Sequence, residues 1–493
     1  MSQSQALYSV AQVRAFDAQA IREQGVSGYT LMQRAGEAAL HALRTRWPTA
    51  LRIAVVCGGG NNGGDGYVLA RYARAAGLEV SVYAAVDAAQ LQGDAQRAAD
   101  DFRVGGGLIR PCAGAAFDGA DVLVDALLGT GARAPLRAEI LAAIAAMNHA
   151  GVPILALDLP SGLDGDRGAP LGAAVRADAT ITFVAPKAGL FLGDGPDYAG
   201  RVLCDTLELP PPAGAGSEPV LERLEEAELA RALPRRGRNV HKGDFGRVLV
   251  VAGGPGMAGA ARLAAEACLR SGAGLVTVAT APGNVTAIIA GRPELICFGA
   301  AVAADVARAL SAASVVAIGP GLGTGNWACT LLDAALGSGK PLVIDADALN
   351  LLSLSAMPKL PQAVLTPHPG EAGRLLGTNA AAVQADRPAA LRSLIALTGS
   401  VVVLKGAGTL VGAPGRISAL CTRGNPGMAA PGMGDVLTGA IAGILAQCQD
   451  PWRAARAGVM AHALAGDDLA RQGGGRGMLA LEVAEGLAHW VNP

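Results

Sequence analysis

The chain has 493 residues, and its 40 Lys and Arg against 41 Asp and Glu give a formal net charge of -1 at pH 7. At about 150 residues per domain, this length predicts two to four domains. A chain without net positive charge has no field that would hold a nucleic-acid backbone or an anionic membrane, which argues against both as partners. Hydrophobic residues make up 51% of the chain, enough for sizeable cores, but aromatic residues make up only 3%.

Glycine is the unusual component of the chain. There are 68 glycines, about twice the usual share of roughly 7%. They follow no three-residue period, which excludes collagen, and they gather at the ends of apolar runs. That placement favours tight turns in which the backbone comes close to a ligand.

The cysteines and the first residues bear on the compartment. The eight cysteines include no C-x-x-C pair, so neither a zinc site nor a small disulfide framework is predicted. The N-terminal residues lack the apolar stretch of a signal peptide, and no run of 18 apolar residues occurs. We therefore expect a cytoplasmic protein that does not span a membrane.

The first half of the chain alternates short β-branched runs with alanine-rich segments of helical period. A helix is predicted over Asp65–Ala76, because Val68, Leu69, Tyr72 and Ala76 share one face and Gly77 ends it. Continuous apolar strands between helices predict a parallel sheet that is covered on both faces. The predicted strands are Leu51–Cys57, Leu78–Ala84, Ala120–Leu127, Val152–Leu159 and Ala179–Ala185.

A proline-rich segment separates the two halves. Residues 210–219 combine prolines with glycine and serine, which predicts a linker between a domain of residues 1–209 and one of residues 220–493. The basic segment RRGRNVHKGDFG follows, and then the α/β pattern resumes. The halves show no close similarity, so we expect two different domains. The strands predicted in the second half are Arg247–Ala252, Gly274–Thr280, Ser314–Ile318, Pro341–Asp345, Ala363–Thr366 and Ser400–Lys405.

The most distinctive motif of the first half is CGGGNNGGDGYVLARYA, residues 57–73, between a predicted strand and a helix. A glycine-rich turn of this kind leaves backbone N–H groups free and directs the positive end of a helix towards an anion. The motif matches neither common nucleotide-binding fingerprint. Asn61, Asn62 and Asp65 add polar groups that a plain turn does not require, so we expect a ligand here.

Two further strand ends of the first half carry polar groups. Asp125 ends one strand and is followed by Gly129–Gly131, and Asp158 and Ser161 follow the next strand. Ligands of open α/β sheets collect outside the carboxyl ends of the strands, where these segments would converge. Oxygen atoms of Asn, Asp and Ser suit a hard cation. The alternative is that the two aspartates cap the turns that follow them.

The second half contains three glycine-rich or rigid strand ends. VVAGGPGMAGAARLAAEACLRSGAG, from Val250, reads as strand, turn and helix, and residues 317–325 (AIGPGLGTG) carry almost no side chains. In VLTPHPGEAGRLLG, His368 lies between two prolines whose φ angles are fixed, just before a helix predicted from Glu371. A histidine held in this way favours a ligand-binding role over a structural one.

Phosphate chemistry is indicated by the last two motifs. Lys405 ends a strand and precedes an open turn, and Gly432, Gly434 and Asp435 precede a strongly apolar predicted helix. Free N–H groups beside one carboxylate suit a reaction that deprotonates a hydroxyl group and stabilises a transferring phosphoryl group. A capping role for Asp435 would be compatible with catalysis.

The motifs resemble those of the bifunctional NAD(P)H-hydrate repair enzymes. GGGNNGGDG, VDALLGTG, LDLPSGLDGD and FVAPKAGL are similar to their N-terminal domain, and GPGLG, TPHPGE, LKGAGT and GMGDVLTG to their C-terminal domain. The resemblance implies an α/β protein with a Rossmann-like three-layer domain followed by a ribokinase-like domain. The first would interconvert the R and S forms of the hydrated cofactors NADHX and NADPHX. The second would dehydrate the S form with ADP, giving NAD(P)H, AMP and phosphate.

The resemblance also implies residues of the epimerase site. Asp158 would bind the substrate and act as acid or base. A potassium ion would be ligated by Asn62, Asp125 and Ser161. The hydrated dinucleotide would be held by Asn61, Asn62, Gly63, Gly64, Asp65, Gly129, Thr130, Gly131, Ala132, Arg133, Ala134 and Pro135.

Residues of the dehydratase site follow in the same way. Asp435 would be the catalytic base, and Mg²⁺ would accompany the nucleotide. The S-hydrate would be contacted by Ala260, Gly321, His368 and Asp435. The adenine nucleotide would be held by Lys405, Gly406, Ala407, Gly408, Thr409 and Gly434.

One position departs from the family pattern, and two other functions are open. Pro431 stands where members carry a small flexible residue, so it would stiffen the loop and affect rate rather than function. A kinase acting on a vitamin or sugar alcohol would use the same C-terminal motifs, and the N-terminal domain could be a non-catalytic binding module. We expect a homo-oligomer with small-molecule substrates and no nucleic-acid or membrane partner.

Overall fold

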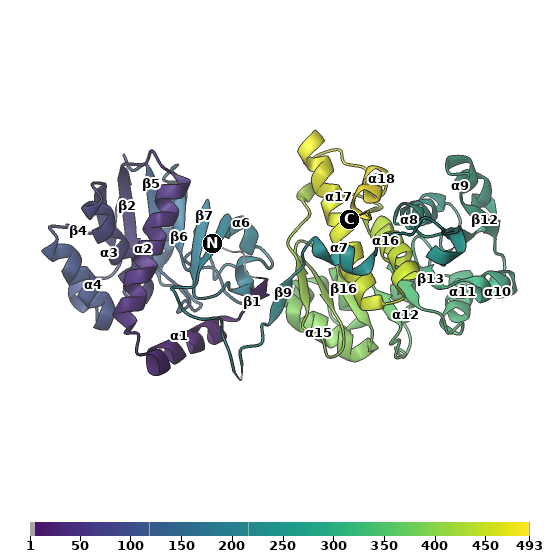
Figure 1. Cartoon of the computed structure of the whole chain (residues 1–493), viewed down its shortest axis with the longest axis horizontal. Coiled ribbons are helices and arrows are strands. Elements are labelled where there is room, and N and C mark those ends of the chain that lie inside the picture. The colour runs from purple at the N-terminus through teal and green to yellow at the C-terminus, as the bar shows by residue number, and fades with distance from the viewer. Residues whose placement is uncertain (1–4, 118, 215, 493) are drawn as a thin grey trace. The chain divides into compact units, whose positions relative to one another are not determined.

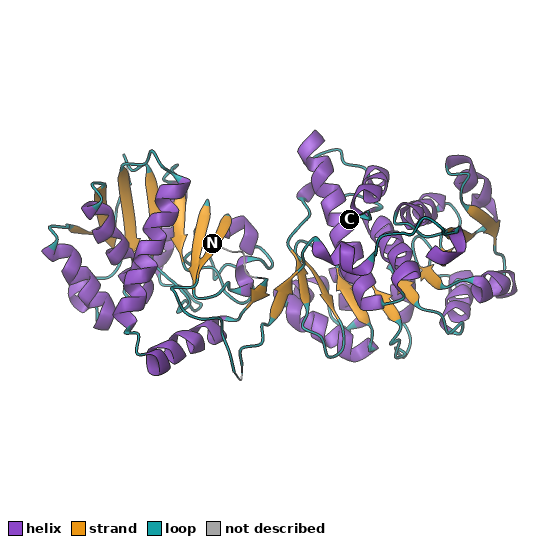
Figure 2. Ribbon diagram, in the orientation of Figure 1, coloured by secondary structure: helices purple, strands orange, loops and turns teal. Residues whose placement is uncertain are grey.

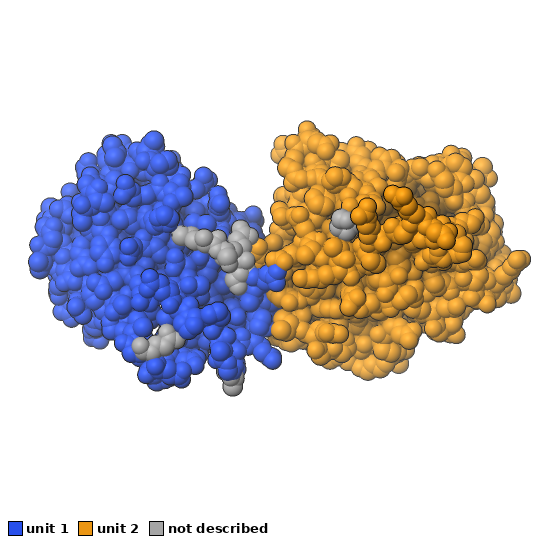
Figure 3. Space-filling view, viewed as in Figure 1, with its two compact units in different colours: residues 1–221 blue, residues 222–493 orange. Residues whose placement is uncertain are grey.

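The computed structural model describes residues 5–117, 119–214 and 216–492. The chain forms two compact units, residues 1–221 and residues 222–493, which are coloured separately in Figure 3. The segment predicted as a linker lies at the end of the first unit. In the described part of the chain, no helix combines the length and the apolar character needed to cross a membrane.

The first unit is built on a seven-stranded sheet whose neighbouring strands are all parallel, in the order β4-β3-β2-β5-β6-β7-β8. Its strands are β1 (Ala6–Leu7), which lies outside this sheet, β2 (Arg52–Cys57), β3 (Glu79–Ala84), β4 (Ile109–Pro111), β5 (Val122–Ala126), β6 (Ile154–Leu157), β7 (Ala179–Phe183) and β8 (Arg201–Asp205). Its helices are α1 (Val10–Gln24), α2 (Gly28–Arg46), α3 (Asn61–Ala75), η1 (Ala88–Gln90), α4 (Gly93–Val104), α5 (Ala138–His149), η2 (Ala188–Leu190) and α6 (Gly195–Ala199).

Both faces of this sheet are buried, as predicted. Successive side chains of β2 point to opposite faces. Ile53 and Val55 belong to a core formed with α2, α3 and α4, whereas Ala54 and Val56 belong to a second core formed with α5. The unit is therefore a three-layer α/β/α structure, in which the central sheet is visible between helices in Figure 2.

The second unit contains a mixed sheet in the order β9-β18-β17-β16-β15-β14-β13-β10-β11-β12, with β17 antiparallel to both of its neighbours. Its strands are β9 (Leu221–Arg223), β10 (Arg247–Val251), β11 (Leu275–Thr280), β12 (Ile296–Gly299), β13 (Val315–Ile318), β14 (Leu342–Ile344), β15 (Ala363–Leu365), β16 (Val401–Leu404), β17 (Thr409–Gly412) and β18 (Ala419–Cys421). Its helices are α7 (Ala227–Ala232), η3 (Lys242–Phe245), α8 (Ala258–Arg270), η4 (Pro282–Asn284), α9 (Val285–Gly291), α10 (Ala303–Ala312), α11 (Asn326–Leu336), α12 (Ala346–Leu352), α13 (Pro369–Leu375), α14 (Ala380–Ala385), α15 (Arg387–Thr398), η5 (Pro426–Met428), α16 (Met433–Cys448), α17 (Pro451–Gly473) and α18 (Ala480–Trp490).

This second sheet also has a core on each face. Val248 and Val250 of β10 pack in a core with α8, α16, α17 and α18. Leu249 and Val251 belong to the opposite core, with α10, α11 and α12. Helix α16 is buried along most of its length, and it lies close to α8 and α17 (Figure 1). The most apolar predicted helix is thus a central element of the unit.

The predicted strands are confirmed, but three helices begin earlier than predicted. Helix α3 begins at Asn61 instead of Asp65, because Gly60 takes the extended N-cap conformation. Helix α13 begins at Pro369, since proline is well suited to the first helical position. Helix α16 begins at Met433 after Gly432, whose φ is +83°. The first turns of these helices therefore contain residues that were expected in the preceding turns.

Strand order reverses once within each parallel region. In the first unit, β3 and β5 lie on opposite sides of β2, and in the second unit, β11 and β13 lie on opposite sides of β10. Ligands of open α/β sheets bind outside the carboxyl ends of the strands at such a reversal. The predicted site residues follow these strands, so they lie at the carboxyl-end edge of each sheet, where a ligand is expected.

Candidate active sites

In the first unit, glycines bring the turns after β2 and β5 together. A Cβ atom on Gly58 would lie 1.8 Å from the carbonyl oxygen of Leu127, and one on Gly63 would lie 2.0 Å from the carbonyl oxygen of Gly58. A Cβ on Gly129 would lie 3.1 Å from Cβ of Asn62. The two segments predicted to hold the dinucleotide are therefore in contact where they begin.

Asp125 and Ser161 form one hydrogen-bonded group at the end of β5. The Ser161 hydroxyl donates to Asp125 Oδ1 at 2.5 Å, and the Ser161 N–H donates to Asp125 Oδ2 at 2.7 Å. Burial raises the pKa of Asp125 to about 6, although the hydrogen bonds from Ser161 oppose the shift. The Leu127 N–H also donates to Asp125 at 3.2 Å, so the capping alternative is correct as an additional role of this aspartate.

Asn62 is the third residue predicted to bind potassium, and its side chain is unusual. It is 8% exposed, and neither its amide oxygen nor its amide nitrogen has a hydrogen-bond partner in the described part of the chain. A buried polar group without a partner costs about 1–3 kcal/mol. The oxygen is thus available to a ligand at the edge where Asp125 lies.

Asp158 is held by a buried lysine that the sequence analysis did not assign. Asp158 follows β6 with a φ of +66°, a strained conformation for a residue other than glycine. Lys187 is 1% exposed and forms an ion pair with Asp158 Oδ1. Its Nζ also donates to Thr182 Oγ1 at 3.0 Å and to the carbonyl oxygen of Phe183 at 2.8 Å. The partners of Asp158 are these neighbours, so the capping alternative is wrong for this residue.

Two more carboxyl groups interact with this ion pair. Burial raises the pKa of Asp65 well above its usual value, and the charges of Asp158 and Asp17 raise it further. Burial likewise raises the pKa of Asp17 to about 6, while Lys187 opposes the shift and Asp158 adds to it. The site therefore contains one ammonium group among three carboxyl groups, and two of those groups retain protons at higher pH than usual.

The remaining predicted epimerase residues are less closely connected. Thr130 Oγ1 accepts a hydrogen bond from Arg14 Nε at 3.3 Å. Arg133, Ala134 and Pro135 are exposed, and in the described residues no hydrogen bond or ion pair joins their side chains to the rest of the site. Of the loop formed by residues 129–135, the start at Gly129 thus lies against the predicted site, whereas the end at Pro135 does not.

In the second unit, the turns after β10 and β13 meet in the same way. The Gly254 N–H donates to the carbonyl oxygen of Gly321 at 2.6 Å. A Cβ on Gly321 would lie 3.0 Å from Cβ of Ala260, and one on Gly319 would lie 1.8 Å from the carbonyl oxygen of Asp345. Ala260 and Gly321, both predicted to contact the S-hydrate, are therefore neighbours beside the end of β14.

Lys405 lies in the centre of a carboxylate cluster at the ends of β14, β15 and β16. Its Nζ is 2.6 Å from Asp345 Oδ1 and 3.8 Å from Glu371 Oε2. Burial alone would lower the pKa of Lys405, but the charges of Asp345 and Glu371 outweigh burial and raise it. His368 is the N-cap of α13, with its Nε2 3.1 Å from Glu371 Oε1. Glu371 thus links two predicted residues, His368 and Lys405.

Asp435 lies in the first turn of α16 beside this cluster. Burial, followed by the charge of Asp345, raises the pKa of Asp435 to about 7, while Lys405 opposes the shift. The N-cap of α16 is Gly432, and among the described residues no side-chain hydrogen bond from this N-cap position is present. A Cβ on Gly434 would lie 3.3 Å from Lys405 Nζ. The arrangement joins a carboxyl group that titrates near neutrality, a cation and the free N–H groups of a helix terminus.

The predicted nucleotide loop, residues 405–409, is held by Arg387, which the sequence analysis missed. Arg387 is 4% exposed, and its guanidinium donates to the carbonyl oxygens of Leu404, Lys405 and Gly408 at 3.1–3.3 Å. Gly406 and Gly408 have φ angles of +138° and +65°. A charged side chain thus holds a loop whose backbone conformation favours glycine, while Gly406 and Ala407 remain exposed.

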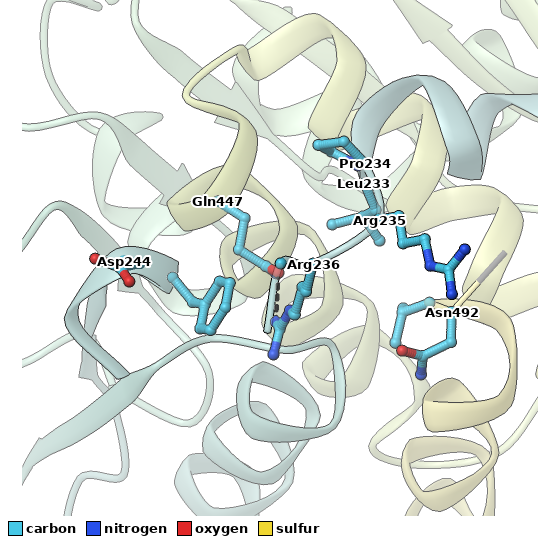
Figure 4. A pocket seen from close by; sticks show the side chains of 10 residues that line it. Leu233, Pro234, Arg235, Arg236, Asp244, Gln447 and Asn492 are labelled. Atoms are coloured by element: carbon cyan, nitrogen blue, oxygen red, sulfur yellow. Dashed lines mark hydrogen bonds between the residues drawn. The ribbon is translucent and has the colours of Figure 1, made fainter. Parts of the chain in front are cut away.

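One cavity of the second unit lies away from the predicted site residues. It has a volume of about 640 Å³ and is lined by residues of the basic segment that leads into η3 (Figure 4). Arg236 Nη2 donates to the carbonyl oxygen of Gly272 at 2.6 Å and to Gln447 Oε1 at 2.7 Å. These acceptors lie at the C-terminal ends of α8 and α16, where positive charge is stabilising. Arg236 therefore supports two helices, and no predicted site residue lines this cavity.

Comparisons with known proteins match each half of the chain. The family described as YjeF-related protein N-terminus matches residues 28–189, and the family described as NAD(P)H-hydrate dehydratase matches residues 248–488. A ribokinase-like superfamily protein from Enterococcus faecalis is a structural neighbour, with 33% sequence identity and a TM-score of 0.51, covering 56% of this chain and 98% of that chain. The likeness agrees with the ribokinase-like fold predicted for the second unit.

Two relatives match nearly the full length. The bifunctional NAD(P)H-hydrate repair enzyme Nnr of Coxiella burnetii is 46% identical over 487 residues, which are 99% of each chain. The enzyme of the same name from Escherichia coli is 43% identical over 469 residues, covering 95% of this chain and 90% of that chain. The chain therefore belongs to the bifunctional NAD(P)H-hydrate repair enzymes, which combine an epimerase with a nucleotide-dependent dehydratase.

Proposed function

We propose that the chain repairs NADHX and NADPHX in two successive steps, with residues 1–209 as the epimerase domain, 210–219 as a linker and 220–493 as an ADP-dependent dehydratase domain. The observation that carries the second step is the placement of Asp435. It combines a pKa of about 7 with a position in the first turn of α16, next to Lys405. A base beside an anion-stabilising helix terminus suits phosphorylation of a hydroxyl group.

In the dehydratase, Asp435 takes the proton of the C6 hydroxyl of the S-hydrate. The hydroxyl oxygen bonds to the terminal phosphorus of ADP, and AMP leaves. Phosphate then departs from C6 with loss of a proton from C5, which restores the dihydronicotinamide ring. Lys405 and the N–H groups of α16 stabilise the transferring phosphoryl group, and Ala260, Gly321 and His368 position the hydrate. Gly406, Ala407, Gly408, Thr409 and Gly434 hold the nucleotide.

Magnesium would enter this site with the phosphates of the nucleotide. In the described part of the chain, no group of three or more His, Cys, Asp or Glu side chains forms a metal cage. Mg²⁺ in nucleotide enzymes is usually bound through substrate phosphates and one or two carboxylates, and Asp345 and Glu371 lie beside Lys405. The bound ion would neutralise phosphate charge.

In the epimerase, Asn61 to Asp65 and Gly129 to Pro135 hold the hydrated dinucleotide, and Asp158 acts as acid or base at C6. Asn62, Asp125 and Ser161 fit a potassium ion, because all three offer oxygen atoms and the amide oxygen of Asn62 is buried without a partner. A bound K⁺ would offset the charge of Asp125 and join the turns after β2, β5 and β6.

An assay with a mixture of both NADHX epimers tests the division of labour. With ADP and Mg²⁺, the wild-type chain should consume both epimers and restore absorbance at 340 nm. The Asp435→Asn variant should interconvert them without restoring absorbance, and replacing K⁺ by Na⁺ should slow only the interconversion. Absorbance that returns at the wild-type rate in Asp435→Asn would contradict the role of this aspartate. A phosphorylated product that accumulates without NADH would contradict the elimination step.

We also propose that the protein is a cytoplasmic homo-oligomer. Its eight cysteines are all free thiols, which agrees with a reducing compartment. Light scattering on the purified chain measures the oligomeric state, and a monomer at micromolar concentration would contradict this part of the proposal.

A further inference from the structure

The first long helix, α1, is fastened to the segment that carries Lys187. Tyr8 forms a parallel bridge with Lys187, and its N–H donates to the carbonyl oxygen of Pro186 at 3.0 Å. The Ala188 N–H donates back to the Tyr8 carbonyl oxygen at 2.9 Å. Because α1 begins two residues after Tyr8, this bridge places the helix beside the epimerase site. The region matched by the N-terminal family begins only at residue 28.

Two residues on one face of α1 reach this site. Arg14 and Asp17 are three positions apart and therefore lie on the same side of the helix. Arg14 donates to Thr130 Oγ1 at 3.3 Å, in the loop predicted to bind the dinucleotide. Asp17 interacts electrostatically with Lys187 and Asp158, and also with Asp65 of α3. The helix thus connects the predicted binding loop to the ion pair.

Asp17 does not accept a hydrogen bond from Lys187, so it does not help to hold the ion pair of Lys187 with Asp158. The three acceptors of Lys187 are Asp158, Thr182 and Phe183. In the described part of the chain, no hydrogen bond to the Asp17 carboxyl is present. Burial and the nearby charge of Asp158 raise the pKa of Asp17 to about 6, against the opposing effect of Lys187. A half-buried carboxyl group with a raised pKa and charged neighbours is a typical candidate for a functional site.

We propose that Asp17 is a second acid/base residue of the epimerase and acts together with Asp158. The inference rests on the proposed epimerase function of the first unit. Two carboxyl groups in different surroundings, one ion-paired and one not, form the usual arrangement for an acid and a base at one site.

The chemistry at C6 requires such a pair. C6 carries the hydroxyl group and is bonded to ring nitrogen N1, so inversion needs one C6 bond to break and reform on the other face. Asp17 gives its proton to the hydroxyl oxygen, the C6–O bond breaks with its electron pair leaving on water, and the N1 lone pair forms an N1=C6 bond. Water adds to the opposite face and gives a proton to Asp158. Proton exchange with solvent restores both carboxyl groups, and no atom is gained or lost.

The test compares Asp17→Asn with Asp17→Glu and with the matched control Glu23→Gln. Glu23 lies on the same helix and is exposed, and Gln19 is its one hydrogen-bond donor among the described residues. Interconversion of a single purified epimer, without ADP so that the dehydratase is silent, is followed by chromatography. We expect kcat/KM to fall by at least about 100-fold in Asp17→Asn, the low end for loss of a general acid. Asp17→Glu should retain more activity, and Glu23→Gln should match the wild type.

A pH profile distinguishes catalysis from a structural effect. Since the reaction needs protonated Asp17, wild-type kcat/KM should decrease as the pH rises through about 6, and Asp17→Asn should lack this decrease. Its melting temperature should equal or exceed that of the wild type near neutral pH, because the variant removes a carboxyl group whose ionisation is disfavoured in the folded chain. Wild-type activity in Asp17→Asn, or an unchanged pH profile at reduced rate, would overturn the inference. Absence of interconversion in the wild type would instead refute the proposed epimerase function.

Discussion

The two units use the same electrostatic arrangement but assemble it from different parts of the fold. Each contains a lysine ion-paired with an aspartate, Lys187 with Asp158 in the first unit and Lys405 with Asp345 in the second. Each places a further carboxyl group with a raised pKa beside that pair. In the second unit this group, Asp435, lies in the first turn of a helix, whereas in the first unit Asp17 lies in the middle of α1.

The difference corresponds to the two reactions. A helix terminus offers free N–H groups to a phosphoryl group, and the proposed dehydratase step transfers one. The proposed epimerisation transfers only protons and water, so its acid needs no such donors and can project from the side of a helix. In the proposed mechanisms, the ion pair supplies fixed charge at both sites, and the position of the further carboxyl group distinguishes the two reactions.

Removing either lysine should give the largest effect, and it should abolish one activity while leaving the other in place. Lys405→Met leaves the buried Asp345 without its cation, which typically costs about 3–5 kcal/mol of unfolding free energy. Lys187→Met leaves the half-buried Asp158 without its cation, and we expect a smaller cost there because water reaches this carboxylate. Each variant should lose the activity of its own unit and keep the other. Denaturant unfolding and the two assays measure this.

The exposed Lys242 provides the control, because Lys242→Met should change stability by no more than about 0.5 kcal/mol. Replacing Asp345 by Leu together with Lys405→Met should recover much of the lost stability without restoring the dehydratase. Loss of both activities in either single variant would show that the units do not function separately.

Sequence alone predicts site residues where a motif is formed by neighbouring residues. Asp435 stands among glycines before an apolar run, and Asp125 ends an apolar strand, so the sequence predicts both as site residues. Family membership also decides against the small-molecule kinase and the non-catalytic module that the motifs left open.

Residues that act through tertiary contacts were missed. Asp17 lies in an ordinary amphipathic helix and meets Lys187 only because Tyr8 bridges that distant segment. Arg387 begins a helix and reaches the nucleotide loop across 18 positions of sequence. Helix starts were also misplaced, because Asn and Gly are weak helix formers and only packing in the fold places Asn62 and Gly63 within α3.

The second prediction is that the two activities respond to pH in opposite directions. With Asp435 as the proposed base, dehydratase kcat/KM should increase about tenfold per unit as the pH rises towards 7, where Asp435 loses its proton. With Asp17 as the proposed acid, epimerase kcat/KM should decrease above about 6. Parallel profiles for the two activities of one preparation would contradict this assignment.

The raised pKa of Asp435 also predicts how the stability of the second unit depends on pH. The pKa of Asp435 is higher in the folded chain than its ordinary value of 3.8, so ionisation favours the unfolded state and stability is lost as the pH rises above that value. Asp435→Asn should therefore raise the melting temperature of the second unit at pH 8 and have little effect at pH 4. An equal shift at both pH values would indicate that the charge of Asp435 is not the cause.

The smallest expected effect concerns Arg387, which holds the nucleotide loop without facing the nucleotide. Arg387→Lys keeps the positive charge but cannot reach three carbonyl oxygens at once, because a lysine lacks the planar fork of a guanidinium. The loop should lose its fixed conformation, and KM for ADP should rise by about tenfold, equivalent to 1.4 kcal/mol, with kcat nearly unchanged. Arg392→Lys, an exposed substitution on the same helix, is the control. A decrease in kcat at constant KM would mean that Arg387 acts on the transferring group. The epimerase rate should stay unchanged in both variants, because both substitutions lie in the second unit.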